Sequence, residues 1–560
     1  RRLGEVYKRQ VREAAGLAEA VASARREAAA AFGDGTVFIE RYVEHGRHVE
    51  VQIFGDIFGT VAALGARECS IQRRHQKIVE EAPGVVPSEV RERLHEAAVA
   101  AGRAVDYVGA GTVEFLLTPD GAIHFLEMNT RLQVEHPVTE LCTGLDLVRL
   151  QLLVADGEPL PEAAVFARTS GYAVEVRLCA EDPAEGFRPA TGVLHRFAVP
   201  GVSAEFGGLD RAGLRLDSGV VDGSAVGVHY DSMLAKLIAW APTRGEAARS
   251  LAGALARAEL HGVTTNRDLL VRVLRSPEFA AVEIDTGFLD RHPEVFVPLV
   301  PSDRVPLYTL AAALACAAAR RADAPVLAGL PSGWRNVPAY PQVTRLLGPA
   351  GEVEVRYRLD RAGALAEWAV RPATAPNGDG AAHDGPRIDS SDSGGATLAG
   401  SGTGAGSAGS AGSATGAGST TDGGGIAAVV LVSAAPDRVV LDEAGVRGAY
   451  RVHRVGSAVH VDGPEGSVTL TELPRFPEPT AELPAGSLLA PLPGTVTRVH
   501  VEAGRRVTAG DLLLTLEAMK LEHPVLAPVD GTVVELPVPA GGQVETGAVL
   551  AVVNPLEDTR

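Results

Sequence analysis

The feature that most constrains the fold is a repeat with a period of 37 residues near the C-terminal end of the chain. Residues 489–496 read LAPLPGTV and residues 526–533 read LAPVDGTV, and 507–513 and 544–550 match at the same spacing. Each copy is short, rich in Val and Leu and interrupted by Pro and Gly, a pattern typical of strands and turns. One copy alone is too short to bury a core. The repeat therefore predicts an all-β domain, residues 485–555, made of two half-units packed on each other.

Lys520 falls at the junction of the two copies, in the sequence Glu517-Ala518-Met519-Lys520. The alternation of Leu512, Leu514 and Leu516 predicts one buried strand face leading into a turn that presents the lysine. Among 52 Lys and Arg residues the only lysines are Lys8, Lys77, Lys236 and Lys520. Because the two cations are not interchangeable, lysine is expected where a primary amine is needed. The alternative is a solvated lysine on an ordinary hairpin.

The length, net charge and composition of the chain exclude several classes of protein. A chain of 560 residues is too long for one core, so three to four domains are expected. The net charge of −18 argues against nucleic acid or an anionic membrane as the main partner. No apolar run reaches the roughly 18 residues of a membrane helix, and no signal peptide is recognised. The cysteines show no CxxC pairing and predict reduced thiols in a cytoplasmic protein: Cys69, Cys142, Cys179 and Cys316.

Residues 36–160 alternate strand-like and helix-like segments, which predicts an α+β nucleotide-binding lobe after a helix at 11–32. A hairpin of 112–117 and 122–128 is predicted around Thr118-Pro119-Asp120-Gly121. If Thr118 closes opposite Gly121, Glu114 lies opposite Phe125 and diagonal to Glu127, roughly 7–8 Å away. Two carboxylates at that separation suit magnesium held together with nucleotide phosphates.

The second strand of this hairpin is predicted to continue to residue 135. Its odd positions are polar and share one face by period-2 alternation: Glu127, Asn129, Arg131, Gln133 and Glu135. The alternative is a half-buried strand with a solvated face. A third cluster, residues 68–77, is dense in cations and hydrogen-bond donors that suit phosphate or bicarbonate. The alternative is an ordinary charged surface patch. Lys77, one of the four lysines of the chain, argues against that alternative.

Two sets of motifs carry a family resemblance. The carrier motif Ala518-Met519-Lys520 resembles the biotinyl domain of biotin-dependent carboxylases, whereas lipoyl domains, which share the fold, typically place Asp before the lysine. Residues 73–77 (RRHQK) and 127–137 (EMNTRLQVEHP) resemble biotin carboxylase nearly letter for letter. The resemblance covers about 11–293 and the carrier domain. It implies biotin on Lys520 through an amide bond.

The resemblance also implies roles for individual residues. ATP is bound by Glu40, Val43, His48, Gln72, His75 and Lys77. Magnesium, or manganese, is bound by Glu114, Glu127 and Asn129. Bicarbonate is held by Arg131, Gln133, the backbone of Val134 and Glu135. Glu135 is the base, Lys77 contacts the γ-phosphate, and Arg177 stabilises the biotin enolate. Bicarbonate attack on ATP gives carboxyphosphate, and biotin on Lys520 becomes carboxybiotin.

The expected fold class is multidomain α+β. It comprises a partial ATP-grasp lobe (11–160), a biotin carboxylase C-terminal domain (161–295), a middle β-barrel-like docking domain (300–473) and a flattened-barrel carrier domain (485–555). Residues 1–10 are expected to be non-native, and the family's N-terminal domain and glycine-rich loop have no counterpart here. We therefore expect an N-terminally truncated chain that binds ATP poorly or not at all. A Gly/Ser-rich insertion (372–425) and a Pro-rich link (474–484) are expected to be flexible.

The leading hypothesis is the α subunit of an acyl-CoA carboxylase, a ligase of the acetyl-, propionyl- or 3-methylcrotonyl-CoA type. Its expected partners are a separate carboxyltransferase β subunit, a biotin protein ligase and further copies of itself through the biotin carboxylase region. Sequence does not choose the acyl-CoA. One alternative is a component of a pyruvate or urea carboxylase. The other is an inactive carrier and docking fragment, which bicarbonate-dependent ATPase activity would distinguish.

Overall fold

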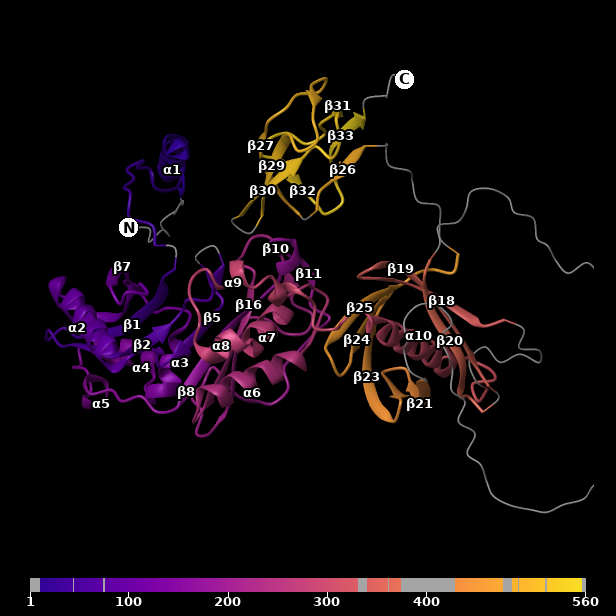
Figure 1. The fold of residues 1–560 in the computed structure, drawn as a ribbon, viewed down its shortest axis with the longest axis horizontal. Coiled ribbons are helices and arrows are strands. Elements are labelled where there is room, and N and C mark those ends of the chain that lie inside the picture. The colour runs from indigo at the N-terminus through magenta and orange to yellow at the C-terminus, as the bar shows by residue number, and fades with distance from the viewer. Residues whose placement is uncertain are drawn as a thin grey trace, which may run out of the picture.

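The computed structural model describes residues 11–43, 45–73, 76–330, 340–360, 362–373, 429–476, 486–491, 493–518 and 521–555. These residues form a carboxylase body, a barrel around one helix and a small all-β carrier unit (Figure 1). The insertion and the link lie almost entirely outside the described residues. Among those described, no helix has the length and apolarity that crossing a bilayer requires. All four cysteines are free and buried.

A nine-stranded sheet organises the carboxylase body, in the order β13-β14-β16-β8-β5-β2-β1-β6-β7. It runs through both regions predicted as separate domains, because β5 pairs with β8. The bounds are Arg47–Gly55 (β1), Val61–Glu68 (β2), Val79–Ala82 (β5), Gly109–Leu117 (β6), Ile123–Asn129 (β7), Tyr172–Cys179 (β8), Val202–Glu205 (β13), Gly213–Ser218 (β14) and Met233–Ala241 (β16). Strand β1 is buried along almost its whole length, so the sheet centre forms a protected site.

Helices cover this sheet because each presents an apolar stripe to it. Helix α2 (Ser88–Ala104) packs on β1 and β2, α3 (His136–Thr143) packs on β8 and β2, and α6 (Arg244–Ala256) packs on β16 and β8. Two shorter helices lie on the same part of the sheet: α4 (Leu147–Ala155) packs on β6, and α5 (Glu162–Val165) packs on β2. The predicted helix at 11–32 is present as a short 3-10 turn (Ala14–Gly16) and α1 (Leu17–Phe32), which stands apart from the sheet (Figure 1).

The hairpin register differs from the prediction. The turn pairs Thr118 with Ala122, since Thr118 N donates to Ala122 O at 3.0 Å. An irregularity between Glu114 and Phe115 then shifts the pairing once more. Glu114 therefore lies directly opposite Glu127, not diagonal to it. The bulge brings the two carboxylates closer than the predicted register would.

The prediction of one strand over 127–135 is wrong beyond Asn129. Strand β7 ends there, and residues 130–135 form a loop that leads into α3 at His136. The chain turns inward at this point, so that Gln133 is 4% and Glu135 2% exposed while Arg131 is exposed. The polar residues of this segment therefore do not share one strand face.

The predicted middle domain is an eight-stranded antiparallel sheet curled around helix α10 (Val305–Ala322), as Figure 1 shows. Nearly every residue from Leu307 to Ala319 is buried, because the barrel surrounds the helix. The strands are Gln342–Gly348 (β18), Gly351–Leu359 (β19), Leu365–Pro372 (β20), Val429–Ala435 (β21), Arg438–Glu443 (β22), Val446–Val455 (β23), Ala458–Asp462 (β24) and Ser467–Glu472 (β25). The β-barrel-like fold expected for this region is therefore confirmed.

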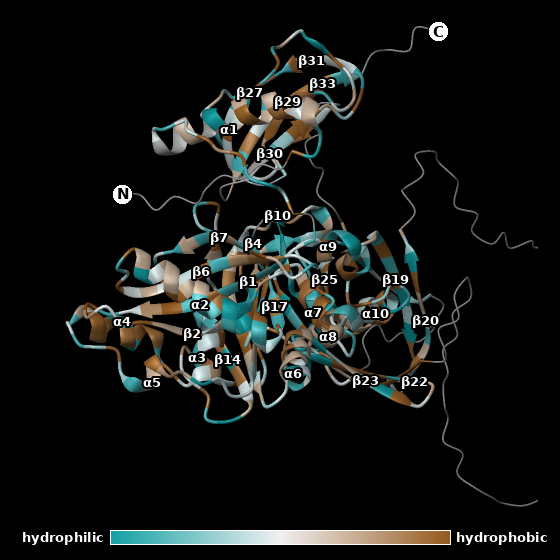
Figure 2. Ribbon diagram, turned by 60° about the vertical axis from the view of Figure 1, so that its left-hand side comes forward, coloured by the Kyte–Doolittle hydropathy of each residue, from teal (hydrophilic) through white to brown (hydrophobic). Residues whose placement is uncertain are grey.

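The carrier unit consists of two four-stranded sheets, β26-β33-β31-β28 and β30-β29-β27-β32. A shift of 37 residues relates β27 (Gly494–Val499) to β31 (Gly531–Glu535), β28 (Arg506–Val507) to β32 (Gln543–Val544), and β29 (Leu512–Ala518) to β33 (Val549–Pro555). Strands β26 (Ser487–Leu489) and β30 (Leu521–Leu526) occupy matching edges. The predicted packing of two half-units is confirmed. Figure 2 shows the apolar residues of this unit concentrated on its strands.

One detail of the carrier prediction is wrong. Leu514 and Leu516 are buried, but Leu512 is 37% exposed and Leu513 is buried in its place. An irregularity between Leu512 and Leu514 shifts the pairing with β30 and reverses the side-chain alternation. The face leading to Ala518 is therefore Leu514, Leu516 and Ala518.

Candidate active site

A buried ion pair between Lys77 and Glu135 lies at the centre of the site. Lys77 stands on the two-residue strand β4 (Gln76–Lys77), and Glu135 immediately precedes α3. Lys77 Nζ is 2.5 Å from Glu135 Oε1 and 3.0 Å from Glu114 Oε1, and it also contacts Glu50. Burial alone would lower the pKa of Lys77, but the charges of Glu50 and Glu135 raise it well above its ordinary value. The ammonium is therefore charged and surrounded by carboxylates.

Arg177 on β8 holds the other oxygen of Glu135. Its Nη2 is 3.0 Å from Glu135 Oε2, and its Nε is 2.6 Å from Glu80 Oε1. Burial would raise the pKa of Glu135, but Lys77, Arg177 and Arg67 lower it well below its ordinary value. A carboxylate held between two cations is ionised at neutral pH, and it is ready to accept a proton once a ligand draws either cation away.

Glu114 gathers a second set of donors. Asn129 Nδ2 and Gln133 Nε2 donate to its Oε1 at 2.8 and 2.7 Å, and His48 Nε2 lies 3.1 Å from its Oε2. Burial would raise the pKa of Glu114, but contact with His48 and the charge of Lys77 lower it. This carboxylate is therefore a hard anionic oxygen ligand at neutral pH.

The residues predicted to bind magnesium fit that role. Glu114 and Glu127 are cross-strand partners in β6 and β7, and Asn129 follows two residues later on the same strand. Ionised carboxylate oxygens and an amide oxygen are the donors that magnesium prefers. His48, Glu50 and Glu114 also place ligand atoms within 4.8 Å of one another.

Other predicted residues lie farther from this cluster or outside the description. Gln72 on β3 (Gln72–Arg73) is a neighbour, because it pairs with Lys77 across β3 and β4. Arg131 is exposed, and its Nη1 lies 3.4 Å from Leu132 O. Glu40 is exposed and Val43 half-buried in an irregular segment before β1. His75, Met519 and Lys520 lie outside the described residues.

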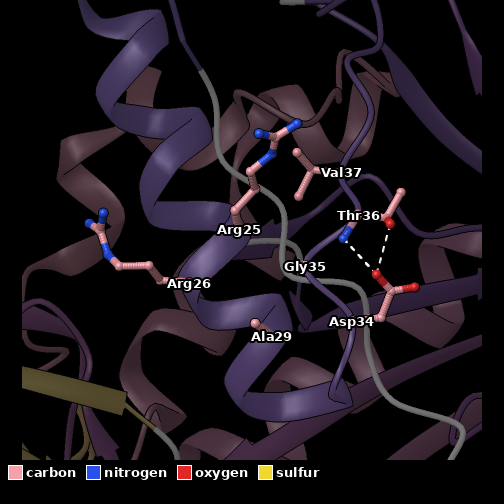
Figure 3. A pocket seen from close by; sticks show the side chains of 7 residues that line it. All are labelled: Arg25, Arg26, Ala29, Asp34, Gly35, Thr36 and Val37. Atoms are coloured by element: carbon pink, nitrogen blue, oxygen red, sulfur yellow. Dashed lines mark hydrogen bonds between the residues drawn. The ribbon is translucent and has the colours of Figure 1, made fainter.

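A hollow among the described residues lies elsewhere. It has a volume of about 500 Å³ and is lined by α1 and residues 34–37. Figure 3 shows its rim, where Asp34 accepts hydrogen bonds from the N and Oγ1 of Thr36 at 2.9 and 2.7 Å. None of the predicted site residues lines it. The convergence of charged side chains, not this hollow, therefore defines the candidate site.

Sequence reasoning missed four charged residues of the site, namely Glu50, Arg67, Glu80 and Lys236. Glu50 contacts Lys77 and Arg67, and Lys236 Nζ donates to Val134 O at 2.9 Å. Two signals were available. Glu50 shares the alternation of the strand that contains His48, and Lys236 is one of the four lysines. Arg67 and Glu80 carried no such signal, because their roles depend on contacts between distant segments.

The carrier site is described as far as Ala518. Strand β29 ends at Ala518, which is 3% exposed, and pairs it with Leu521 of β30. Glu517 is exposed on the opposite face. The carrier core also packs on Val228, a residue of the carboxylase body. The described part of the motif, Glu517 and Ala518, thus lies at the end of a paired strand, and the predicted turn at Lys520 stays a prediction.

Three family models match the chain. They are "Carbamoyl-phosphate synthase L chain, ATP binding domain" over residues 3–163, "Biotin carboxylase C-terminal domain" over 175–291 and "Biotin-requiring enzyme" over 486–553. ATP and biotin are thus the cofactors of these domains. The first match begins inside residues 1–10, which are not described by the structure, so the assignment of that segment as non-native stays a prediction.

Several relatives match most of the chain. It is 35% identical over 524 residues to methylcrotonoyl-CoA carboxylase subunit alpha of Mus musculus, covering 92% of this chain and 66% of the relative. It is 36% identical over 523 residues to propionyl-CoA carboxylase alpha chain of Ruegeria pomeroyi, covering 90% of this chain and 69% of the relative. The chain thus spans about two thirds of the length of these relatives.

A solved structure is also similar. The biotin carboxylase domain of 2-oxoglutarate carboxylase from Hydrogenobacter thermophilus, in complex with MgADP, ADP and bicarbonate, is 41% identical, with a TM-score of 0.47. The match covers 50% of this chain and 60% of that chain. Together, the ATP-binding, carboxylase and biotin domains and the two α-subunit relatives establish the family. The chain belongs to the biotin-dependent acyl-CoA carboxylase α subunits.

Proposed function

We propose that this chain, in its full-length protein, catalyses the ATP- and bicarbonate-dependent carboxylation of biotin held on Lys520. The carboxyl group then passes to a separate carboxyltransferase β subunit, which carboxylates an acyl-CoA. The observation that carries this proposal is the buried Glu135 carboxylate, shared between Lys77 and Arg177. A general base beside two cations suits the activation of one anion for attack on another.

Each of these groups has a distinct task. Glu135 accepts the proton of bicarbonate, since its low pKa keeps it ionised. Lys77 offsets the negative charge that repels bicarbonate from the γ-phosphate, the main obstacle in phosphoryl transfer. Arg177 stabilises the oxygen that becomes negative when biotin loses its N1 proton. Its contact with Glu80 keeps the guanidinium beside Glu135.

Bicarbonate is assigned to the loop between β7 and α3. Gln133 and Val134 directly precede Glu135 in this loop, and His136 Nδ1 lies 2.8 Å from Gln133 O. That contact fixes the peptide whose N–H belongs to Val134. Arg131 is the remaining bicarbonate ligand, and its exposed side chain must reorient to take part.

The nucleotide and its metal are assigned to neighbouring residues. Glu114, Glu127 and Asn129 bind magnesium, which neutralises phosphate charge when bound. His48, Gln72 and His75 are assigned to the nucleotide, Lys77 to its γ-phosphate, and Glu40 and Val43 to the adenine edge. Because these two precede β1 in an irregular segment, they must move toward the sheet on binding.

The experiment is a bicarbonate-dependent ATPase assay of the full-length protein, followed by intact-mass analysis after co-expression with a biotin ligase. The proposal expects ATP hydrolysis that requires bicarbonate, and one biotin attached at Lys520. ATP hydrolysis without bicarbonate dependence would contradict the carboxylase function. Absence of biotin would contradict the carrier function.

The partners and the compartment follow from the same proposal. A carboxyltransferase β subunit, a biotin protein ligase and a second carboxylase domain are the expected partners. The barrel around α10 is proposed as the docking unit for the β subunit. The four cysteines of the chain are buried free thiols, which supports a reducing compartment, and we propose the cytoplasm.

A further inference from the structure

Arg67 on β2 is fully buried and uses every hydrogen-bond donor it has. Its Nε donates to Glu50 Oε1 at 2.6 Å. One terminal nitrogen, Nη1, donates to Gln52 Oε1 at 2.8 Å and Thr139 Oγ1 at 3.0 Å. The other, Nη2, donates to Thr112 Oγ1 at 3.2 Å and Gln133 Oε1 at 2.7 Å. A guanidinium has five N–H donors, and here all five have acceptors.

The contact with Gln133 decides which way its side-chain amide faces. A guanidinium only donates, so it must face the oxygen of the amide. The nitrogen then faces the opposite direction, and Gln133 Nε2 donates to Glu114 Oε1 at 2.7 Å. Gln133 is 4% exposed, so solvent does not compete for either end.

We propose that Arg67 is a positioning residue, which fixes the amide of Gln133 so that its NH₂ group points toward Glu114 and the adjoining Lys77, where bicarbonate is proposed to bind. The inference rests on the proposed function, because it assumes that Gln133 binds bicarbonate. Bicarbonate is an acceptor-rich anion and requires N–H donors. A reversed amide would present a carbonyl oxygen to the anion and repel it.

The guanidinium of Arg67 also binds Glu50, which contacts Lys77 at the centre of the site. Glu50 accepts from Arg67 through one oxygen and contacts Lys77 through the other. Strand pairing places Glu50 directly opposite Arg67 in β1 and β2. The rigid, planar guanidinium of Arg67 thus connects Gln133, in the loop between β7 and α3, with Glu50 on β1, which contacts Lys77. The flexible ammonium of a lysine cannot make both contacts in the same geometry.

A purely structural role is the competing explanation, since a buried ion pair can stabilise a fold without acting on the ligand. The two roles differ in what they do to kinetics. Loss of positioning raises the KM for bicarbonate and acts through Gln133. Loss of stability lowers the melting temperature and the amount of active enzyme, and it leaves the KM for bicarbonate unchanged.

The test is a double-mutant cycle in the full-length protein, with Arg67→Lys, Gln133→Met and both together, in the bicarbonate-dependent ATPase assay. Each single variant is expected to raise the KM for bicarbonate about tenfold, as positioning partners of a ligand typically do. The double variant is expected to match Gln133→Met, because Arg67 acts through Gln133. Thr139→Val removes another acceptor of Arg67 and should change this KM by less than about twofold.

Two outcomes overturn the proposal: an unchanged KM for bicarbonate in Arg67→Lys, or effects that multiply in the double variant. If Arg67→Lys does not fold, Thr112→Val replaces it, since Thr112 shares the Nη2 group that holds Gln133. Its KM for bicarbonate should then exceed that of Thr139→Val, and equal values overturn the proposal. An unchanged KM in Gln133→Met instead contradicts the bicarbonate role of Gln133, and with it both proposals.

Discussion

Lys77 and Glu135 form an ion pair in the protein interior, with side chains that are only 8% and 2% exposed. They are 58 residues apart in sequence, and each also contacts a group of opposite charge elsewhere in the site. The pair keeps the base ionised and the ammonium charged at neutral pH. This relationship leads to the first prediction.

Glu135→Gln is expected to lower bicarbonate-dependent ATP hydrolysis at least about 100-fold, because the amide cannot accept the bicarbonate proton. Nucleotide affinity, measured by calorimetry, should change by less than about threefold. The matched control is Glu140→Gln in α3, whose carboxylate contacts Arg215 at 2.8 Å. Wild-type turnover in Glu135→Gln would refute the role of this residue as the base.

Lys520→Arg is expected to abolish biotin attachment, since only a primary amine forms the required amide, while charge and length are nearly kept. Avidin blotting and intact mass measure the result. The melting curve of the carrier unit should match that of the wild type. An avidin-reactive Lys520→Arg protein would disprove the assignment of the modified lysine.

Two glycines test the internal symmetry of the carrier unit. A Cβ on Gly494 would lie 2.6 Å from Glu517 O, and one on Gly531 would lie 2.4 Å from Asn554 O, positions related by the 37-residue shift. Either Gly→Ala change should cost the carrier unit about 2–3 kcal/mol, by steric overlap with backbone. Thermal unfolding of the two variants should therefore be similar.

The control for these variants is Gly504→Ala. Gly504 has a φ of +90° but open space around the added Cβ, so only backbone strain of about 1 kcal/mol is expected. A Gly494→Ala protein no less stable than Gly504→Ala would contradict the close approach of the strands.

Four histidines join the carboxylase body to the barrel and predict an acid-sensitive junction. His195 Nδ1 lies 3.0 Å from His460 Nε2, and His261 Nδ1 lies 2.9 Å from His453 Nδ1. The rings of His261 and His460 are stacked with centroids 4.5 Å apart. Burial, together with the neighbouring histidines, lowers the pKa of His460 to about 3.

The direction of the effect follows from this lowered pKa. The unfolded chain, with an ordinary histidine pKa of about 6.5, takes up the proton first as pH falls. The contribution of His460 to stability is complete above about pH 6.5 and is lost progressively toward pH 3. The melting temperature of the barrel should therefore drop between pH 7 and pH 5. His460→Gln should flatten this slope, and His124→Gln, at an exposed position, should leave it unchanged. An equal slope in His460→Gln would contradict the prediction.

The local patterns of the sequence predicted much of this molecule. The 37-residue repeat required two interlocking half-units, because neither half buries a core alone. The long motifs around Lys77 and Glu135 predicted the family, which the matching domains and relatives confirm. The turn residues 118–121 predicted the hairpin of β6 and β7, because Pro and Gly at these positions favour a tight turn between two strands.

Tertiary structure alone decided the details that matter for chemistry. Bulges shifted the strand registers at Glu114 and Leu512. A one-residue slip moves side chains to the other face of a strand, and its position depends on packing with the partner strands. The inward turn after Asn129 buried Gln133 and Glu135 and left Arg131 outside. The fork of Arg67 depends on acceptors from four separate segments of the chain, so no local pattern could reveal it.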